Sequence, residues 1–378
     1  MIRLKPEQYT QALPLFAAMA AWNVYVTAVL HQKSPGRVYV DNLEAPRSGF
    51  LVSIDRGYLV GDPHNGDFND ALRDELEATL LAGDRVNPAD PELVLSLEST
   101  DWEPALADIL GDWRWPPIWG SNRHYRFDQP KLNWRELLPA GYTIVQLDIA
   151  LLAEQGLRLP QHIIESIRLG WENEANFVEN GFGLAALYDG ELVCWCMADV
   201  TVGDACEIGI ETVPAHRQRG LAAAVTAATV EHYSQAGYRH IGWHCEASNQ
   251  GSIKTAEKVG FVLERPYHDY TFIYDEPRHY AELGRFYFFE AQLYEEAADM
   301  LEIAIETDEA PPAYVYFLTA RAMAHLEEPV ALEYLQEAVA AGFKDWELLQ
   351  TLPELEAYRH HPDFPQRSDS PSPDQNNG

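Results

Sequence analysis

In the middle third of the chain, apolar residues change several times from alternating spacing to helical spacing. Three predicted strands follow one another closely, and Asp189–Gly190 between the first two favours a hairpin turn. Strands and helices alternate after them, and a glycine follows each helix. This order predicts an α/β domain with an antiparallel hairpin followed by crossover connections. The predicted strands are 142–148, 183–188, 191–200, 205–213, 240–245 and 270–274, and the predicted helices are 219–236 and 250–259.

The first 139 residues have a mixed α/β pattern of their own. The segment 131–141 contains Pro139 and Gly141 and marks a boundary, so we expect domains at 1–139 and 140–275. In the first domain we expect a largely helical start over 1–30, an amphipathic helix at 68–82, and strands at 37–41, 49–54, 93–97 and 122–127.

The chain after residue 275 shows an internal repeat. A small-residue and leucine pattern, A-x3-L-x2-A, recurs after 34 residues and resembles the helix pairs of tetratricopeptide repeats. We therefore expect an all-α, tetratricopeptide-like region over 276–365, and we expect 366–378, rich in Ser, Pro, Asp and Asn, to be a disordered tail. The repeated residues are Ala297, Leu301 and Ala304, and then Ala331, Leu335 and Ala338.

The charge is large, negative and uneven. The formal net charge of −32 argues against nucleic acid as a partner, because a phosphate backbone would be repelled. The segment from Glu276 to Gly378 holds six Lys and Arg against 21 Asp and Glu, whereas Glu207 to Arg265 holds six of each. A polyanionic cofactor is therefore tolerated in that neutral window. No apolar run is long enough to predict a membrane span.

The four cysteines lie in the predicted strands of the middle domain. This placement favours buried free thiols in a reducing, cytoplasmic setting over a disulfide framework. Cys194 and Cys196 are two residues apart, which is not the spacing of a zinc knuckle, so we expect no metal site.

The most informative stretch runs from Glu207 to Ala222, where a strand leads through a turn into an alanine-rich helix. The first amides of a helix have no intrahelical partner, and with the helix dipole they offer a seat for a pyrophosphate. Gly220 lets the backbone approach phosphate oxygens closely, and Arg217 and Arg219 can add charge-assisted hydrogen bonds.

A second motif follows at residues 249–261, N-x-x-S-x-x-x-A-x-K-x-G-F. With R-x-x-G-x-A at residues 217–222, it resembles the two signatures of the GNAT acetyltransferase superfamily. The words E-I-G-I-E-T, R-x-R-G-L-A, W-x-C and S-x-x-x-A-E-K-V-G-F resemble its zwittermicin-resistance-like branch. In that branch a further half precedes the transferase, and VYVDN and PRSGF between Val38 and Phe50 look similar to it.

The resemblance implies the GNAT fold and acetyl-CoA as cosubstrate. It places the pyrophosphate on the motif at 217–222, the pantetheine arm on the backbone of the preceding strand, and the thiol end near the second motif. Asn249 also suits a helix N-cap, and both roles can coexist. The implied cofactor-binding residues are Thr212, Val213, Arg217, Gln218, Arg219, Gly220, Leu221, Ala222, Asn249 and Ser252.

The implied reaction is direct attack of an amine on the thioester, which needs a base and an acid. Glu207 and Glu211 face the same side of one strand, and either can be the base. The family often places a tyrosine as acid where this chain has Ala256, which leaves the acid open. The alternatives are Ser252, Tyr267, Tyr270 and water.

The main hypothesis is an N-acetyltransferase that acts on the amine of a small cationic molecule. Two alternatives remain: a non-catalytic acyl-CoA sensor or scaffold whose repeats bind a partner protein, and an acetyltransferase whose repeats dock a protein substrate. We also expect the first 139 residues to be a degenerate copy of the same fold. The loop Gly61–Gly66 lacks a basic residue other than histidine. We therefore expect this first half of the chain to shape the acceptor cleft without binding cofactor.

Overall fold

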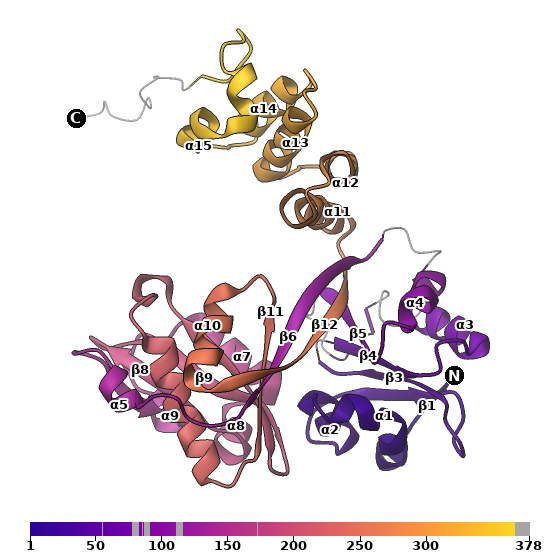
Figure 1. Ribbon diagram of the computed structural model, residues 1–378, viewed down its shortest axis with the longest axis vertical. Coiled ribbons are helices and arrows are strands. Elements are labelled where there is room, and N and C mark those ends of the chain that lie inside the picture. The colour runs from indigo at the N-terminus through magenta and orange to yellow at the C-terminus, as the bar shows by residue number, and fades with distance from the viewer. Residues whose placement is uncertain are drawn as a thin grey trace. The chain divides into compact units, whose positions relative to one another are not determined.

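The computed structural model describes residues 1–54, 56–77, 83–84, 86, 91–110, 116–171 and 173–366 (Figure 1). Contacts divide the chain into two compact units, Met1–Asp112 with Trp119–Thr271, and Trp113–Ile118 with Phe272–Gly378. The domain boundaries expected at residues 139 and 275 stay predictions, and the tail expected from residue 366 lies outside the described residues after Gln366. No helix among the described residues is long and apolar enough to cross a membrane.

The first unit is built on one sheet, which has twelve strands in the described part of the chain. Most neighbours are antiparallel, but β4 pairs with β5 and β10 pairs with β11 in parallel. In spatial order the strands are β1 (Ile2–Arg3), β2 (Arg37–Val40), β3 (Ser48–Val52), β4 (Arg56–Gly61), β5 (Glu92–Leu97), β12 (Phe261–Ile273), β6 (Ile118–Phe127), β11 (His240–Glu246), β10 (Ala205–Thr212), β9 (Glu191–Val202), β8 (Gly183–Tyr188) and β7 (Thr143–Gln146).

The strand order is symmetric about its centre, as two copies of one fold would make it. Strands β1 to β5 are matched in reverse order by β7 to β11. The two central strands are exchanged: β6 follows β5 in the chain but pairs with β11, and β12 follows β11 but lies beside β5. Each half therefore completes the sheet of the other, and the two long strands run together at the middle of the unit (Figure 1).

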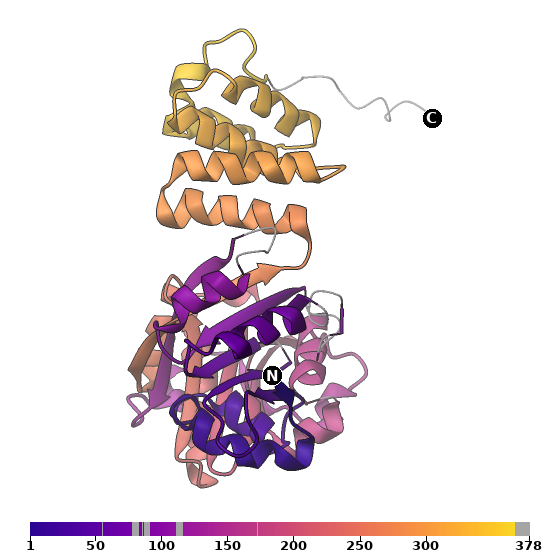
Figure 2. The same ribbon diagram turned by 90° about the vertical axis from the view of Figure 1, so that its right-hand side faces the viewer.

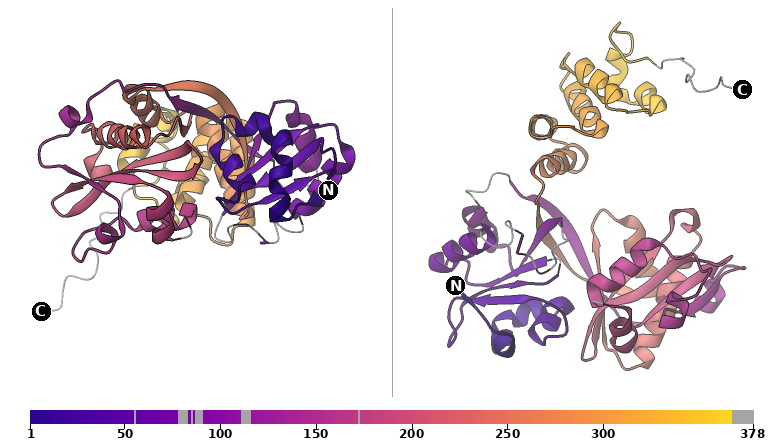
Figure 3. Two further views of the ribbon diagram at one scale, coloured as in Figure 1. Left: turned by 90° about the horizontal axis from the view of Figure 1, so that it is seen from below. Right: turned by 180° about the vertical axis from the view of Figure 1, so that it is seen from behind.

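Helices cover both faces of this sheet. In the first half, α1 (Leu13–Ala20) and α2 (Val24–Leu30) lie on one face, and α3 (Gly66–Glu75) and α4 (Trp102–Leu110) lie on the other (Figures 1 and 3). The second half carries α5 (Trp134–Leu137), α6 (Ile149–Leu152), α7 (Gln161–Trp171), α8 (Glu174–Asn180), α9 (Leu221–Gln235) and α10 (Gln250–Val259).

Helix α9 lies close to its strands because its buried face is made of small residues. Ala223, Ala224 and Ala228 are all buried, and Tyr233 donates a hydrogen bond of 3.0 Å to the carbonyl of Phe182. Short side chains let the helix backbone approach the sheet, which fixes the position of its N-terminus. The N-terminus of α9 is thereby held at the end of β10.

Several expected elements differ from the structure. The strand expected at 270–274 begins at Phe261, because Glu264–Arg265–Pro266, which look like a turn, continue the central strand β12. Strand β4 and helix α4 were not expected at all. The helix expected at 68–82 begins at Gly66, and residues 78–82 lie outside the described residues. The helical start divides into a 3-10 helix, α1 and α2.

The second unit is a row of helices, and each of the first three packs on the next (Figure 2). Its repeated residues, 297, 301, 304, 331, 335 and 338, are all at most 2% exposed. The 34-residue repeat thus places equivalent positions in the core of two successive helix pairs, and their assignment to tetratricopeptide repeats stays a prediction. The helices are α11 (Glu276–Phe286), α12 (Tyr294–Thr307), α13 (Ala313–His325), α14 (Ala331–Ala340) and α15 (Trp346–Thr351).

The glycine at the end of α10 generates a stability prediction. Gly260 has φ +128°, and a Cβ there would lie 1.9 Å from the carbonyl oxygen of Gln129. We expect Gly260→Ala to lower the free energy of unfolding by about 2–3 kcal/mol, through backbone strain and overpacking. The melting temperature followed by circular dichroism measures the change.

Gly251 in the same helix is the matched control. A Cβ at this position would make only an ordinary contact of 3.6 Å with Asn249. Gly251→Ala should therefore stabilise the helix by up to about 1 kcal/mol. Equal melting temperatures for the two variants would contradict the role given to Gly260.

Candidate functional site

The second half opens between two parallel strands. β10 pairs with β11 only from Ala205 to Glu207, opposite His240 to Gly242. Beyond that point β10 continues beside β9 as far as Thr212, while β11 continues beside β6. The two strands diverge, and one edge of β10 is left without strand partners among the described residues.

The amide of Thr212 faces this opening. The next residue, Val213, donates its N–H to the carbonyl of Val193 on the β9 side, at 2.9 Å. Successive residues of a strand direct their backbone groups to opposite sides, so the Thr212 amide and carbonyl face away from β9. Arg217 confirms the direction, because its Nε donates to the Thr212 carbonyl at 2.9 Å.

Helix α9 begins at the mouth of the opening with free amides. Gln218 and Gly220 both have positive φ, +60° and +83°, and turn the chain into the helix. The amide of Ala224 makes the first bond of the helix, to the carbonyl of Gly220. Among the described residues no side chain caps this terminus, so the preceding N–H groups are available to an anion.

A cavity of about 780 Å³ covers this terminus. Its charged lining is mainly basic, Arg217, Lys254 and Lys258, against the carboxylate of Glu211. That balance is opposite to the net charge of −32 over the whole chain. The lining residues are Ile210, Glu211, Thr212, His216, Arg217, Gln218, Gly220, Leu221, Ala222, Ala223, Asn249, Gly251, Ser252, Lys254, Thr255 and Lys258.

The cavity brings together most residues expected from the sequence, but not all of them. Arg219 instead donates to the hydroxyl of Tyr142 at 3.1 Å and to the carbonyl of Ala215 at 3.0 Å. It holds the turn in place and does not line the cavity. Val213 does not line it either, and its amide is already bonded to Val193.

Two lysines of α10 line the cavity although they were not expected in the site. Lys254 and Lys258 are one helical turn apart, so both lie on the side of α10 that lines the cavity. That spacing was readable from the sequence, and Lys258 is part of the second motif. Their contribution makes the cavity more positive than Arg217 alone would.

Asn249 and Ser252 hold the start of α10. The Oδ1 of Asn249 accepts a hydrogen bond of 3.0 Å from the amide of Ser252, which is the N-cap role weighed from the sequence. The hydroxyl of Ser252 accepts a bond of 2.9 Å from Nε1 of Trp243. Both residues also line the cavity, so the structural role does not remove them from it.

The two carboxylates proposed as base lie in different surroundings. Glu211 lines the cavity, is 41% exposed, and lies 2.9 Å from Nε2 of His162 on α7. Glu207 is 1% exposed and does not line the cavity. Its carboxylate lies between the imidazoles of His124 on β6 and His244 on β11.

Burial changes the protonation of this inner group. It raises the pKa of Glu207, and the His124 imidazole and the His244 backbone amide partly oppose the shift. Burial holds the pKa of His244 well below its usual range, and the neighbouring His124 imidazole and Arg56 guanidinium add to the effect. A neutral imidazole at His244 follows from this environment.

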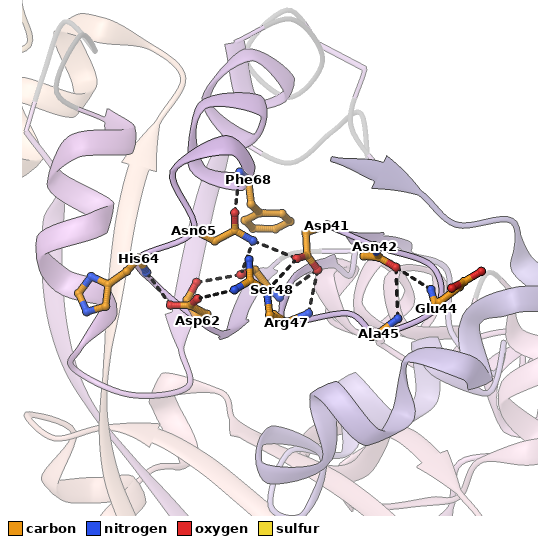
Figure 4. A network of polar contacts seen from close by, with 10 residues as sticks. All are labelled: Asp41, Asn42, Glu44, Ala45, Arg47, Ser48, Asp62, His64, Asn65 and Phe68. Carbon is orange, nitrogen blue, oxygen red and sulfur yellow. Dashed lines mark hydrogen bonds and ion pairs between the residues drawn. The ribbon is translucent and has the colours of Figure 1, made fainter.

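The corresponding corner of the first half is closed (Figure 4). β4 and β5 stay paired from Arg56 to Leu59, and the amide of Gly61 donates to the Glu98 carboxylate at 2.7 Å. Asn65 caps α3, with its Oδ1 accepting from the amide of Phe68.

Carboxylates surround that capped terminus. Asp41 accepts hydrogen bonds from the amides of Arg47 and Ser48 and from the Asn65 side chain, and Asp62 lies 3.7 Å from Arg47 (Figure 4). An anionic ligand would meet these acidic groups and a capped helix. The corner therefore differs from the start of α9 in both hydrogen bonding and charge.

Known proteins resemble this chain over the first unit. The Bacillus subtilis (strain 168) protein named uncharacterized N-acetyltransferase YdfB is 27% identical over 247 residues, which cover 64% of this chain and 88% of that protein. A GCN5-related N-acetyltransferase-like protein from Streptococcus suis 89/1591 shares the fold, with a TM-score of 0.50 and 21% identity over 70% of this chain and 98% of its own. A GCN5-related N-acetyltransferase from Sphaerobacter thermophilus has a TM-score of 0.51 and 16% identity, covering 72% of this chain and 95% of its own.

The family model described as GNAT acetyltransferase matches residues 14–270, which include both halves of the first unit and the whole of the cavity lining. The chain belongs to the GNAT acetyltransferase family.

Proposed function

We propose that this protein transfers an acetyl group from acetyl-CoA to the amine of a small cationic molecule. The observation that carries the proposal is the basic cavity at the uncapped start of α9, in a chain that is otherwise strongly acidic. A diphosphate is the part of acetyl-CoA that such a site would hold. Membership of the family supports acetyl-CoA as the donor.

We propose binding groups for each part of the cofactor. The amides before Ala224 take the diphosphate, and Arg217, Lys254 and Lys258 supply positive charge around it. The amide of Thr212 on the open edge of β10 takes a carbonyl of the pantetheine arm. Gly220 leaves the approach free, since a Cβ there would meet only Leu137, at 3.8 Å.

The amine nitrogen attacks the thioester carbonyl carbon, and the carbon–sulfur bond breaks to release CoA as a thiolate. Glu211 takes a proton from the substrate ammonium, which gives the neutral amine its lone pair for the attack. Glu211 has this role because its carboxylate reaches the cavity and solvent, while Glu207 is sealed in the core. His162 lies 2.9 Å from Glu211 and holds it in place.

The candidates for the acid that protonates the thiolate are the hydroxyl groups of Ser252, Tyr267 and Tyr270, and water. The Ser252 hydroxyl lies on the cavity lining, whereas the hydroxyl of Tyr267 is 2.9 Å from Nδ1 of His244. Burial raises the pKa of Tyr270, with the Glu103 carboxylate adding to the effect. Ser252 or water is therefore the nearest source of the proton.

Carboxylates on one face of β10 favour a cationic acceptor. The carboxylate of Asp199 lies against Gly209, two positions before Glu211 on that face, and accepts a hydrogen bond from Tyr25 on α2. Neighbouring negative groups such as Asp199 and Glu211 raise the local concentration of a polyamine or aminopolyol. The zwittermicin-resistance-like branch, whose implied substrate is such an aminopolyol, stays a prediction.

The cofactor site is tested by a charge placed at the start of α9. Gly220→Glu should weaken acetyl-CoA binding at least about 100-fold, because a carboxylate would occupy the diphosphate seat and oppose its charge. Isothermal titration calorimetry measures the dissociation constant. A wild-type protein that does not bind acetyl-CoA at millimolar concentration would sink the proposal.

Gly237→Glu is the matched control at the other end of the same helix. Gly237 also has positive φ, +93°, and a Cβ there meets no atom within 4 Å in the described structure. It therefore repeats the backbone strain and the added charge at a distance from the cavity. Its affinity for acetyl-CoA should stay within a factor of two or so of wild type.

The base is tested by Glu211→Gln, with thiol release from acetyl-CoA followed over a panel of primary amines and polyamines. We expect kcat/KM to fall by about 10²–10⁴, while acetyl-CoA affinity is kept. The deficit should shrink as pH rises, because a larger share of the amine is already deprotonated in solution.

Glu191→Gln is the control for this experiment, since Glu191 lies at the start of β9 in an exposed pair with Arg158. It should keep wild-type rates. A deficit of Glu211→Gln that is constant with pH would reject the base role. Acetyl-CoA binding with no thiol release from any amine would instead favour the sensor or scaffold hypothesis.

A further inference from the structure

Three polar side chains from separate strands meet in the core of the first unit without normal hydrogen bonds to one another. Glu207 on β10 lies 3.8 Å from Nε2 of His124 on β6 and 3.7 Å from Nε2 of His244 on β11. Among the described residues, neither Glu207 oxygen and neither Nε2 atom has a hydrogen-bond partner of normal geometry. Leaving such groups buried and unpaired is costly, so the cluster calls for an explanation.

The gap between these atoms has the size of a metal ion. The three ligand atoms lie within 4.8 Å of one another, and their contacts with Glu207 are too long for hydrogen bonds. Ligands at about 2.0–2.2 Å from a tetrahedral zinc lie roughly 3.3–3.6 Å apart. A contraction of a few tenths of an ångström would bring the two contacts with Glu207 into that range.

The outer partners of both histidines are those that metal-binding histidines have. Nδ1 of His124 lies 2.9 Å from the carboxylate of Glu264, and Nδ1 of His244 lies 2.9 Å from the hydroxyl of Tyr267. A proton held on Nδ1 by an outer acceptor leaves a lone pair on Nε2. The Glu264 carboxylate is close enough to favour this tautomer of His124, although its contact with Nδ1 is not a hydrogen bond of normal geometry. Both Nε2 atoms then face Glu207.

The backbone around the cluster leaves this space open. His124 and His244 are direct partners in the β6–β11 ladder. The Glu207 side chain crosses over Gly242, where a Cβ would lie 2.2 Å from Oε2 of Glu207 and 2.9 Å from Nε2 of His124. Trp22 covers the two imidazoles, with its ring centroid 5.5 and 5.9 Å from theirs. A glycine at position 242 therefore leaves the room that the Glu207 carboxylate occupies.

We infer that His124, Glu207 and His244 bind a divalent transition metal ion of the zinc type. Two imidazoles and a carboxylate are a common donor set for such ions, and a divalent cation compensates the buried carboxylate. The site ties the exchanged strand β6 to β10 and β11. The inference is independent of the proposed reaction, since it assigns Glu207 to the metal and leaves Glu211 as the base.

The test is zinc binding to the full-length, tag-free protein after removal of metals with a chelator. Calorimetric titration with zinc chloride, checked by elemental analysis after desalting, should give about one ion per chain. Cobalt(II) in place of zinc should give the visible absorption of a four-coordinate ion. Less than about a tenth of an ion per chain, or a cobalt spectrum like that of the hydrated ion, would overturn the inference.

Single substitutions distinguish zinc binding at this site from weak zinc binding to the acidic surface. Glu207→Gln keeps the shape and should weaken zinc binding about 100-fold or more, and Tyr267→Phe, which removes only the outer partner of His244, about 10-fold. His268→Gln is the control, because His268 is half-exposed beside Glu103 and should titrate like wild type.

His244→Gln repeats the test on a less buried ligand, in case Glu207→Gln does not fold. Wild-type affinity in either ligand variant would refute the site. Acetyl-CoA affinity measured on the same metal-free samples reports on the proposed function separately, so the two ideas can fail independently.

Discussion

Two parallel strands that share hydrogen bonds leave no space between them, and β10 and β11 stop sharing them after Glu207 and Gly242. The geometry of the candidate site depends on this separation of the two strands. It exposes the Thr212 amide and brings the uncapped start of α9 to the mouth of the opening. The first half has the same strand order, but its corresponding strands stay joined through Glu98 and its helix α3 is capped by Asn65.

The strand exchange holds the two diverging strands in place. The backbone groups of β10 that face the opening have lost their strand partners, and such groups are costly when buried and unpaired, so they suit a site that a ligand fills. The outer edge of β11 stays bonded to β6, which comes from the first half of the chain, and the outer edge of β10 stays bonded to β9. The opening is therefore held by strand partners on both outer sides, one of which comes from the first half of the chain.

Much of the second half could be predicted from the sequence, because its signals are local. The strand at 205–213, the helix that follows it and the glycines after both helices depend on neighbouring residues alone, and they lie within one or two residues of their expected bounds. β12 was misjudged because its exposed middle, with Glu264 and Pro266, reads as a turn until β5 and β6 are placed beside it. Pairing between strands that are distant in the sequence cannot be recognised from neighbouring residues.

The same limit applies to the chemistry. The motif at 217–222 predicted the basic cavity because its residues are consecutive. Arg219 belongs to this motif and was assigned to the cofactor from its residue type alone, but its side chain is hydrogen-bonded to Tyr142 and Ala215 instead. His124 is 83 positions before Glu207 and belongs to the half that was expected to shape the acceptor cleft without binding cofactor. Only the exchange of β6 brings His124 beside Glu207 and His244. A site assembled by strand exchange is therefore invisible to spacing rules, and the pairing of the sheet is what reveals it.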